Sequence, residues 1–162
     1  MRVLLIGATG LVGRSVLARL ADREDIRLDL LLRRAVAGLS SRVRCVVADG
    51  LPAALARWQA EGGRCDVLVS AFGTTRNIAG SVEAFARIDR DLVVEVARAA
   101  RASGARQALL VSSVGAGARS RNDYLRIKGE LENAVAALGF ERCDFLQPGL
   151  LLGAREGFRP AE

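Results

Sequence analysis

Three glycines near the start of the chain constrain its fold more than any other feature of the sequence. They stand at every third position in Gly7-Ala8-Thr9-Gly10-Leu11-Val12-Gly13. The preceding segment, Arg2–Ile6, is a short apolar run typical of a buried strand, and the following segment, Arg14–Ala21, has apolar residues at helical spacing. Glycines here permit a tight turn and the close packing of a helix on a strand. The pattern predicts a strand, a glycine turn and a helix at the start of an α/β fold.

The glycine turn also predicts a phosphate site. Gly10 lets the backbone approach a pyrophosphate, and the N-terminus of the following helix offers free N–H groups and the positive end of its dipole. The spacing is GxxGxxG rather than GxGxxG, but it lies in the strand–turn–helix context that a dinucleotide fingerprint requires. We therefore predict that residues 7–13 bind the phosphates of a dinucleotide. The alternative is a purely structural turn.

The rest of the chain alternates short apolar segments with helical ones. The further predicted strands are Arg27–Leu32, Arg42–Ala48, Asp66–Ala71, Gln107–Val111 and Arg142–Leu146. The further predicted helices are Leu51–Ala60, a long helix capped by Ser81 that ends at Ala102, and Tyr124–Leu138. The long helix is expected to bury Val82, Phe85, Ile88, Leu92, Val93 and Val96. We interpret the alternation as βαβαβαβαβαβ. This predicts one domain over residues 1–162, with a doubly wound (Rossmann) parallel sheet in the order 3-2-1-4-5-6.

Residues that follow the predicted strands indicate which dinucleotide is bound. Arg33 and Arg34 end the second strand, where an NAD site usually has an acidic residue for the ribose 2′-OH. A guanidinium instead matches a 2′-phosphate, so we predict NADP rather than NAD; the alternative is that both arginines are only solvated. Asp49, after the third strand, could accept a hydrogen bond from an adenine amino group or could cap the next helix.

A candidate catalytic set lies near the end of the chain. Ser112 and Ser113 end the fifth predicted strand, and ligands of open parallel sheets bind beyond the carboxyl ends of the strands. Tyr124 is the only tyrosine, and Lys128 is the only lysine among 24 basic residues. Four residues apart, they share one face of a helix. The alternative is an exposed helical pair with no role in chemistry.

Composition excludes several other classes of protein. A net charge of +6 could indicate a nucleic-acid partner, but the arginines are dispersed among 18 acidic residues, so we expect no nucleic acid. With no histidine and no cysteine cluster, we expect neither a metal site nor a histidine-based triad. Cys45, Cys65 and Cys143 are widely spaced and are expected to be reduced thiols. No segment resembles a signal peptide or a membrane span, so we expect a cytoplasmic protein without membrane association.

Taken together, these motifs resemble the short-chain dehydrogenase/reductases of the extended or atypical kind. A closer resemblance is to the oxidoreductase group named after the HIV Tat-interacting protein. That similarity rests on Gly73-Thr74-Thr75-Arg76, Ala79-Gly80, Phe85, Asp89, Ser112-Ser113-Val114-Gly115-Ala116, Tyr124-Leu125, Lys128-Gly129-Glu130, Pro148-Gly149-Leu150-Leu151-Leu152-Gly153, Arg155, Arg159 and Pro160.

The resemblance implies NADP-dependent hydride transfer to or from a small carbonyl or alcohol substrate. Tyr124 would be the general acid, Lys128 would stabilise its phenolate and bind the nicotinamide ribose, and Ser112 or Ser113 would orient the substrate oxygen. Phe72, Gly73 and Thr74 would lie where the backbone passes that ribose. Dimerisation through the two long helices is common in the wider superfamily, which implies a possible homodimer.

The chain departs from the family pattern in two places. Gln147 replaces the usual arginine before Pro148-Gly149, which removes a charged group there. The sequence ends at Glu162, whereas family members continue for some fifty residues that complete the substrate side of the cleft, so the C-terminal substrate part is expected to be short or missing. This leaves an alternative function, an NADP(H)-binding regulatory or sensor protein with little turnover.

Overall fold

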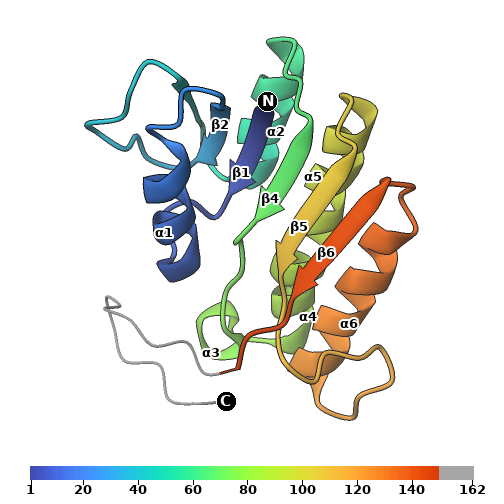
Figure 1. Cartoon of the computed structure of the whole chain (residues 1–162). Coiled ribbons are helices and arrows are strands. Elements are labelled where there is room, and N and C mark those ends of the chain that lie inside the picture. Colours follow the sequence, from blue (N-terminus) through green and yellow to red (C-terminus); the bar gives the residue numbers. More distant parts are fainter. Residues whose placement is uncertain (150–162) are drawn as a thin grey trace.

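A six-stranded parallel sheet forms the centre of the molecule (Figure 1). It is seen in a computed structural model that describes residues 1–149, apart from the side chain of Arg76. The strands are β1 (Arg2–Ile6), β2 (Arg27–Leu32), β3 (Val43–Val47), β4 (Val67–Ser70), β5 (Gln107–Val111) and β6 (Arg142–Leu146). They are ordered β3-β2-β1-β4-β5-β6, and every neighbouring pair is parallel. The predicted doubly wound sheet and its strand order are confirmed.

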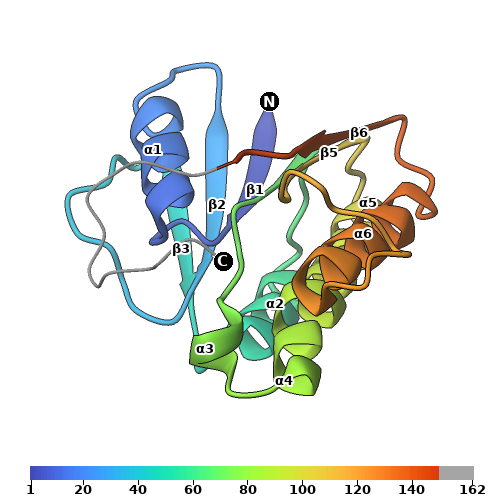
Figure 2. The same ribbon diagram turned by 90° about the horizontal axis from the view of Figure 1, so that it is seen from below.

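Helices cover both faces of this sheet. They are α1 (Leu11–Leu20), α2 (Leu51–Ala60), α3 (Arg76–Ala79), α4 (Val82–Ala86), α5 (Leu92–Ala102) and α6 (Asp123–Ala136), with a π-helical turn, η1 (Arg87–Asp91), between α4 and α5. Figure 2 shows α1 on one face of the sheet and α2, α4, α5 and α6 on the other. The short helix α3 was not predicted. In Figure 1 it lies beyond the carboxyl ends of the strands.

Alternating residues of each strand build two separate cores. Leu4 and Ile6 of β1 pack toward α2, α5 and α6, in a cluster that includes the fully buried Trp58. Val3 and Leu5 point to the opposite face and pack with Leu17 of α1. Because both faces of the central strands are covered, Val3–Ile6 of β1 and Val67–Val69 of β4 are apolar without interruption, as expected for a parallel sheet.

The predicted alternation of strand and helix is wrong at one place. Residues 33–42, between β2 and β3, form a loop with no helix. Parallel strands usually need a crossover of a dozen or more residues, and this shorter segment has no room for a helix and its two connections. The loop is held against α1 by Ser40, whose hydroxyl donates to the carbonyl of Ala21 at 2.9 Å.

The long predicted helix starts as expected, but it is not α-helical throughout, because the π-helical turn η1 separates α4 from α5. The Ser81 side chain caps it by accepting a hydrogen bond from the N–H of Ala84 at 3.1 Å. In η1 the N–H of Leu92 bonds to the carbonyl of Arg87, five residues back, so the turn is wider than an α-helical one. Because this changes the register of the buried stripe, Asp89 is fully buried and Ile88 only half-buried, contrary to the prediction. Phe85, Val93 and Val96 are buried as predicted, whereas Val82 and Leu92 are half-buried.

Candidate active site

The glycine turn after β1 fits tightly between α1 and the segment after β4. Gly7 has φ +78°, and a Cβ on it would lie 2.4 Å from the backbone of Ala71 and Phe72. A Cβ on Gly13 would lie 1.9 Å from the carbonyl oxygen of Gly7. Only glycine is compatible with either position, so the turn and α1 form one closely packed unit.

The N-terminus of α1 offers unpaired backbone donors at the surface. Within residues 1–149, no side chain caps this helix, whose N-cap residue is Gly10, and its first turn contains no acid. Thr9 and Gly10 are exposed, and so is the side chain of Arg14 on the following turn. Open N–H groups, the helix dipole and a guanidinium together favour an anion here.

A cavity of about 310 Å³ begins at this helix end and extends to the predicted catalytic residues. Its lining residues are Thr9, Gly10, Leu11, Val12, Arg14, Ala71, Phe72, Gly73, Thr74, Asp89, Val111, Ser112, Tyr124 and Lys128. The cavity therefore joins the glycine turn, the segment after β4, the end of β5 and the first turns of α6. Of the predicted phosphate-binding stretch, Gly7, Ala8 and Gly13 lie outside the lining. Ala8 is buried, and the two glycines form the tight packing of the turn.

Tyr124 is held in the cavity wall by an aromatic contact. Its ring stacks on that of Phe85 from α4, with the ring centroids 5.5 Å apart and the planes at 29°. Phe85 is fully buried, so it gives the tyrosine ring a fixed support. Tyr124 is also one of the residues that line the cavity.

Lys128 is buried and forms an ion pair within the cavity wall. Its Nζ donates to Oδ1 of Asp89 at 2.6 Å, and the exposed fractions of the two side chains are 6% and 0%. The Nζ atom lies 6.0 Å from the centroid of the Tyr124 ring. The lysine is therefore positioned beside the tyrosine, as the four-residue spacing predicted, but with a carboxylate bound to its ammonium.

The two candidate serines have different surroundings. Ser112 is buried and lines the cavity, and its Oγ has no hydrogen-bond partner among the described residues. Ser113 is not part of the lining, and its Oγ is 3.4 Å from the carbonyl oxygen of Val114. A buried hydroxyl without a partner is uncommon and is expected where a ligand completes the hydrogen bonding. Ser112 is thus the better placed of the two.

The residues predicted to select the cofactor do not line the cavity that is formed by the described residues 1–149. Arg33 and Arg34 are exposed directly after β2, and Asp49 is exposed after β3. All three stand at the carboxyl ends of their strands, on the half of the sheet that α1 covers. The alternative prediction, that Asp49 caps the next helix, is wrong. The N-cap residue of α2 is Gly50, and within residues 1–149 no side chain makes a capping hydrogen bond to this helix.

Sequence reasoning missed two contributors to this site. Arg14 lines the cavity, and its place directly after the third glycine of the turn was the available signal. Asp89 was noted only as part of a family motif, and it lies in the π-helical turn η1. That turn carries no sequence pattern that distinguishes it from the α-helix around it.

Over residues 1–149, no group of three or more acidic, histidine or cysteine residues could hold a metal ion. Within the same range, no helix is long and apolar enough to cross a membrane. Cys45, Cys65 and Cys143 are free thiols, as predicted.

Comparison with known proteins identifies relatives of the chain. The profile of a family described as NAD(P)H-binding matches residues 7–143. The mitochondrial protein fmp52 of Emericella nidulans is 41% identical over 99% of this chain and 71% of its own length. The protein of the same name from Aspergillus fumigatus is 42% identical over 99% of this chain and 70% of its own length. These relatives contradict the expected cytoplasmic location, because both are named mitochondrial proteins.

Solved structures share the fold at low sequence identity. The oxidoreductase ylbE from Lactococcus lactis has a TM-score of 0.75 and 17% identity, and the match covers 96% of this chain and 72% of that one. UDP-glucuronic acid 4-epimerase from Bacillus cereus, solved in complex with NAD, has a TM-score of 0.69 and 12% identity. That match covers 92% of this chain but 57% of the epimerase, so the chain spans little more than half of the epimerase's length.

Proposed function

From the premise that the chain belongs to the NAD(P)H-binding family, we propose that it is an NADP-dependent oxidoreductase of the short-chain dehydrogenase/reductase type. The proposal includes the narrower similarity to the group named after the HIV Tat-interacting protein. One observation carries it: a single cavity brings the glycine turn together with Ser112, Tyr124 and Lys128. The proposed activity requires a small-molecule substrate and neither nucleic acid nor a membrane.

Three features of the cavity fit a dinucleotide. Gly7 and Gly13 of the glycine turn leave no room for a Cβ, the N-terminus of α1 presents open N–H groups, and Ser112 has a buried hydroxyl without a partner among the described residues. Residues Thr9 to Val12 would hold the pyrophosphate, and Phe72 to Thr74 would lie along the nicotinamide half. When bound, the cofactor would supply or accept the hydride.

The side chains of the chain would handle the proton that accompanies this hydride. Tyr124 would donate its phenolic proton to the carbonyl oxygen of the substrate as its carbon is reduced, and would take a proton in the reverse direction. Lys128 would stabilise the resulting phenolate by its positive charge. Ser112 would donate a hydrogen bond to the same substrate oxygen and hold it near the phenol. The buried Phe85 would keep the tyrosine ring in place.

The preference for NADP over NAD rests on arginines. Arg14 lines the cavity, and Arg33 and Arg34 are exposed at the end of β2, where a 2′-phosphate would lie in this fold. A guanidinium binds a phosphate with paired charge-assisted hydrogen bonds. Arg33→Glu combined with Arg34→Glu should therefore weaken NADPH binding by at least about tenfold and NADH binding much less. Tighter binding of NADH than NADPH by the unaltered protein would contradict this assignment.

Turnover tests the reaction itself. NADPH consumption with a panel of small carbonyl compounds should fall by about 100-fold or more in Tyr124→Phe, with NADPH affinity unchanged, because only the proton donor is lost. Ser112→Ala should also slow turnover, and Ser113→Ala provides the matched control one residue away. If NADPH binds but no carbonyl compound is reduced, the enzyme proposal fails, and a cofactor-dependent regulatory protein becomes the better interpretation.

A further inference from the structure

Gly129 is an uncommon kind of residue for the middle of a helix. It lies in α6, one position after Lys128, and it is buried. Glycine is less favourable than alanine in the interior of a helix, so its presence there indicates a packing constraint. A Cβ on Gly129 would lie 2.3 Å from the nitrogen of Ala118 and 2.3 Å from the carbonyl carbon of Gly117. The backbone of the loop between β5 and α6 therefore lies directly on the helix.

A hydrogen bond fixes the loop at the same place. The N–H of Gly117 donates to the carbonyl of Leu125 in α6 at 3.1 Å. Leu125 and Gly129 are four residues apart and share one face of the helix. Tyr124 and Lys128 each lie one position earlier, so the face that holds the loop adjoins the face that carries the proposed reacting groups.

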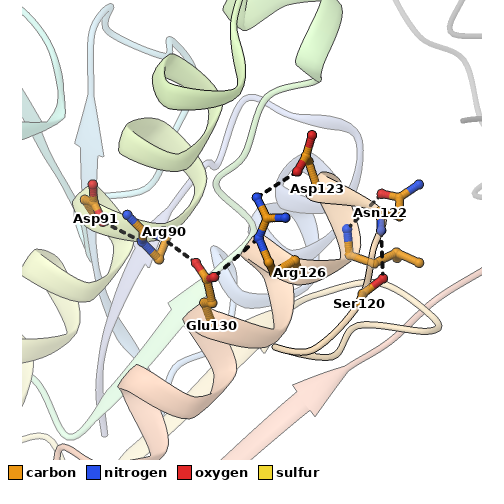
Figure 3. A network of polar contacts seen from close by, with 8 residues as sticks. Arg90, Asp91, Ser120, Asn122, Asp123, Arg126 and Glu130 are labelled. Carbon is orange, nitrogen blue, oxygen red and sulfur yellow. Dashed lines mark hydrogen bonds and ion pairs between the residues drawn. The ribbon is translucent and has the colours of Figure 1, made fainter.

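Further contacts hold the start of α6. Figure 3 shows Ser120 and Asn122 at the end of the loop: the Ser120 hydroxyl accepts from the N–H of Asn122 at 3.2 Å, and the Asn122 side chain accepts from the N–H of Leu125 at 3.2 Å. The same view shows the ion pair between Glu130 of α6 and Arg90 of η1. Since both η1 and the loop bind the helix, both determine where its side chains lie.

This loop connects two groups that the proposed reaction needs at one substrate oxygen. Ser112 directly follows β5, and Tyr124 lies in the first turn of α6. Ordinary contact with a Cβ begins near 3.4 Å, so a methyl group at position 129, at 2.3 Å, would require the loop or the helix to move by about 1 Å. A displacement of that size can cost about 100-fold in rate when it misaligns reacting groups.

We infer that Gly129 is a positioning residue for the proposed reaction: because it has no side chain, the loop lies directly on α6, and this contact fixes Tyr124 relative to Ser112. Gly129 does not line the cavity and acts only through the positions of the loop and the helix. The inference rests on the proposed function for its effect on turnover. The docking of the loop on α6 can be measured without any turnover.

Gly117 provides a matched control on the other side of the same contact. Apart from its chain neighbours, the nearest described heavy atom to a Cβ on Gly117 is the carbonyl oxygen of Gly115, at 4.0 Å. Gly117→Ala therefore adds the same methyl group without a clash, and it keeps the N–H that bonds to Leu125. We expect this variant to retain kcat within about twofold.

Turnover provides the first test. Gly129→Ala should lower kcat for carbonyl reduction by about 10- to 100-fold with the KM for NADPH within about threefold, because the proposed phosphate site on α1 is unaltered. The loss caused by Ser112→Ala should be at least about fivefold smaller in a Gly129→Ala background, because the hydroxyl is then already misplaced. A role in stability alone would leave the two losses additive. Additive losses, or equal kcat values in Gly129→Ala and Gly117→Ala, would overturn the inference.

Thermal unfolding tests the packing of the loop on the helix. In an unhindered helix, alanine at position 129 would raise the unfolding midpoint. Here Gly129→Ala should lower the midpoint by about 2–12 °C, because the methyl group overpacks the contact, whereas Gly117→Ala should shift it by less than about 2 °C. A raised midpoint in Gly129→Ala would refute the direct contact.

Hydrogen exchange tests the docking in the unaltered protein, so this test does not depend on the folding of Gly129→Ala. Labelling with 15N-glycine marks all 17 glycines, and Gly117→Ala identifies the Gly117 signal by its loss. The Gly117 amide should exchange at least about 100-fold more slowly than that of Gly38, which is exposed in the loop between β2 and β3. Equal exchange of the two amides would overturn the inference. If the Gly117 amide is protected but the unaltered protein reduces no carbonyl compound, the proposed function fails and the docking of the loop stands.

Discussion

Burial decides the chemistry of individual side chains in this protein. Ser112 and Ser113 have the same side chain at adjacent positions, yet one Oγ is enclosed at the cavity and the other lies against a backbone carbonyl. Cys65 is only 2% exposed, and its burial raises the pKa of the thiol to about 12, with smaller contributions from the charges of Asp29 and Asp66. This thiol is therefore expected to be unreactive at neutral pH.

The raised pKa of Cys65 predicts how stability depends on alkaline pH. The unfolded thiol loses its proton near the ordinary value of 9.0, whereas the folded one keeps it up to about 12. Between these values the unfolded state binds fewer protons, so stability is complete below pH 9.0 and falls as the pH rises toward 12. The slope should be about 1 kcal/mol per pH unit in urea unfolding. Cys65→Ala should flatten it, and an equal slope in that variant would contradict the prediction.

At the scale of elements, the site depends on the close packing of α1 on the turn after β1. The helix can present its N-terminal donors to the cavity because Gly13 lies directly on the Gly7 carbonyl. A larger residue would move the helix axis away from the turn, and with it the donors of the first helical turn. The proposed phosphate site is therefore a property of two packed elements.

Gly13→Ala tests this packing. The new methyl group would lie 1.9 Å from the Gly7 oxygen, so we expect a loss of about 1–3 kcal/mol of unfolding free energy and at least a tenfold loss of NADPH affinity. Urea unfolding and calorimetric titration measure the two effects. Ser15→Ala, at an exposed position of the same helix, should leave NADPH affinity unchanged. If Gly13→Ala binds NADPH as tightly as the unaltered protein, the assigned phosphate site is wrong.

At the scale of the whole molecule, the outer surface of α5 and α6 is suited to pairing with a second copy. A groove of about 460 Å³ there is lined by Arg90, Asp91, Val94, Glu95, Arg98 and Ala134. Apolar residues lie between acids and bases, so two copies related by a two-fold axis could match each base with an acid. This face lies away from α1 and the glycine turn (Figures 1 and 2).

We therefore predict a homodimer formed through α5 and α6. Light scattering after size-exclusion chromatography should give twice the chain mass of 17.2 kDa. Val94→Arg should produce a monomer, because it places a desolvated charge at the centre of the interface. Ala18→Arg, on the exposed surface of α1, should remain dimeric. A monomeric unaltered protein, or a dimer that survives Val94→Arg, would exclude this interface.

The sequence by itself determined the strands, most helices and the sheet order. The predicted bounds of β2, β5, β6 and α2 agree with the structure, because each is a segment rich in apolar residues that is bounded by turn residues. The glycine turn was recognisable from the sequence because Gly7 and Gly13 occupy positions that leave no room for a Cβ. Residues 150–162, with the predicted Leu150 to Gly153 motif and Arg155, Arg159 and Pro160, lie outside the described part of the chain.

Only the tertiary structure decided how the predicted site residues combine. The structure shows that Ser112 lines the cavity and Ser113 does not, and that the segment between β2 and β3 is a loop without a helix. The bond between Asp89 and Lys128 joins residues 39 positions apart, and Asp89 lies in a π-helical turn. Local sequence patterns do not contain such contacts, because burial and charge pairing are set by the packing of whole elements.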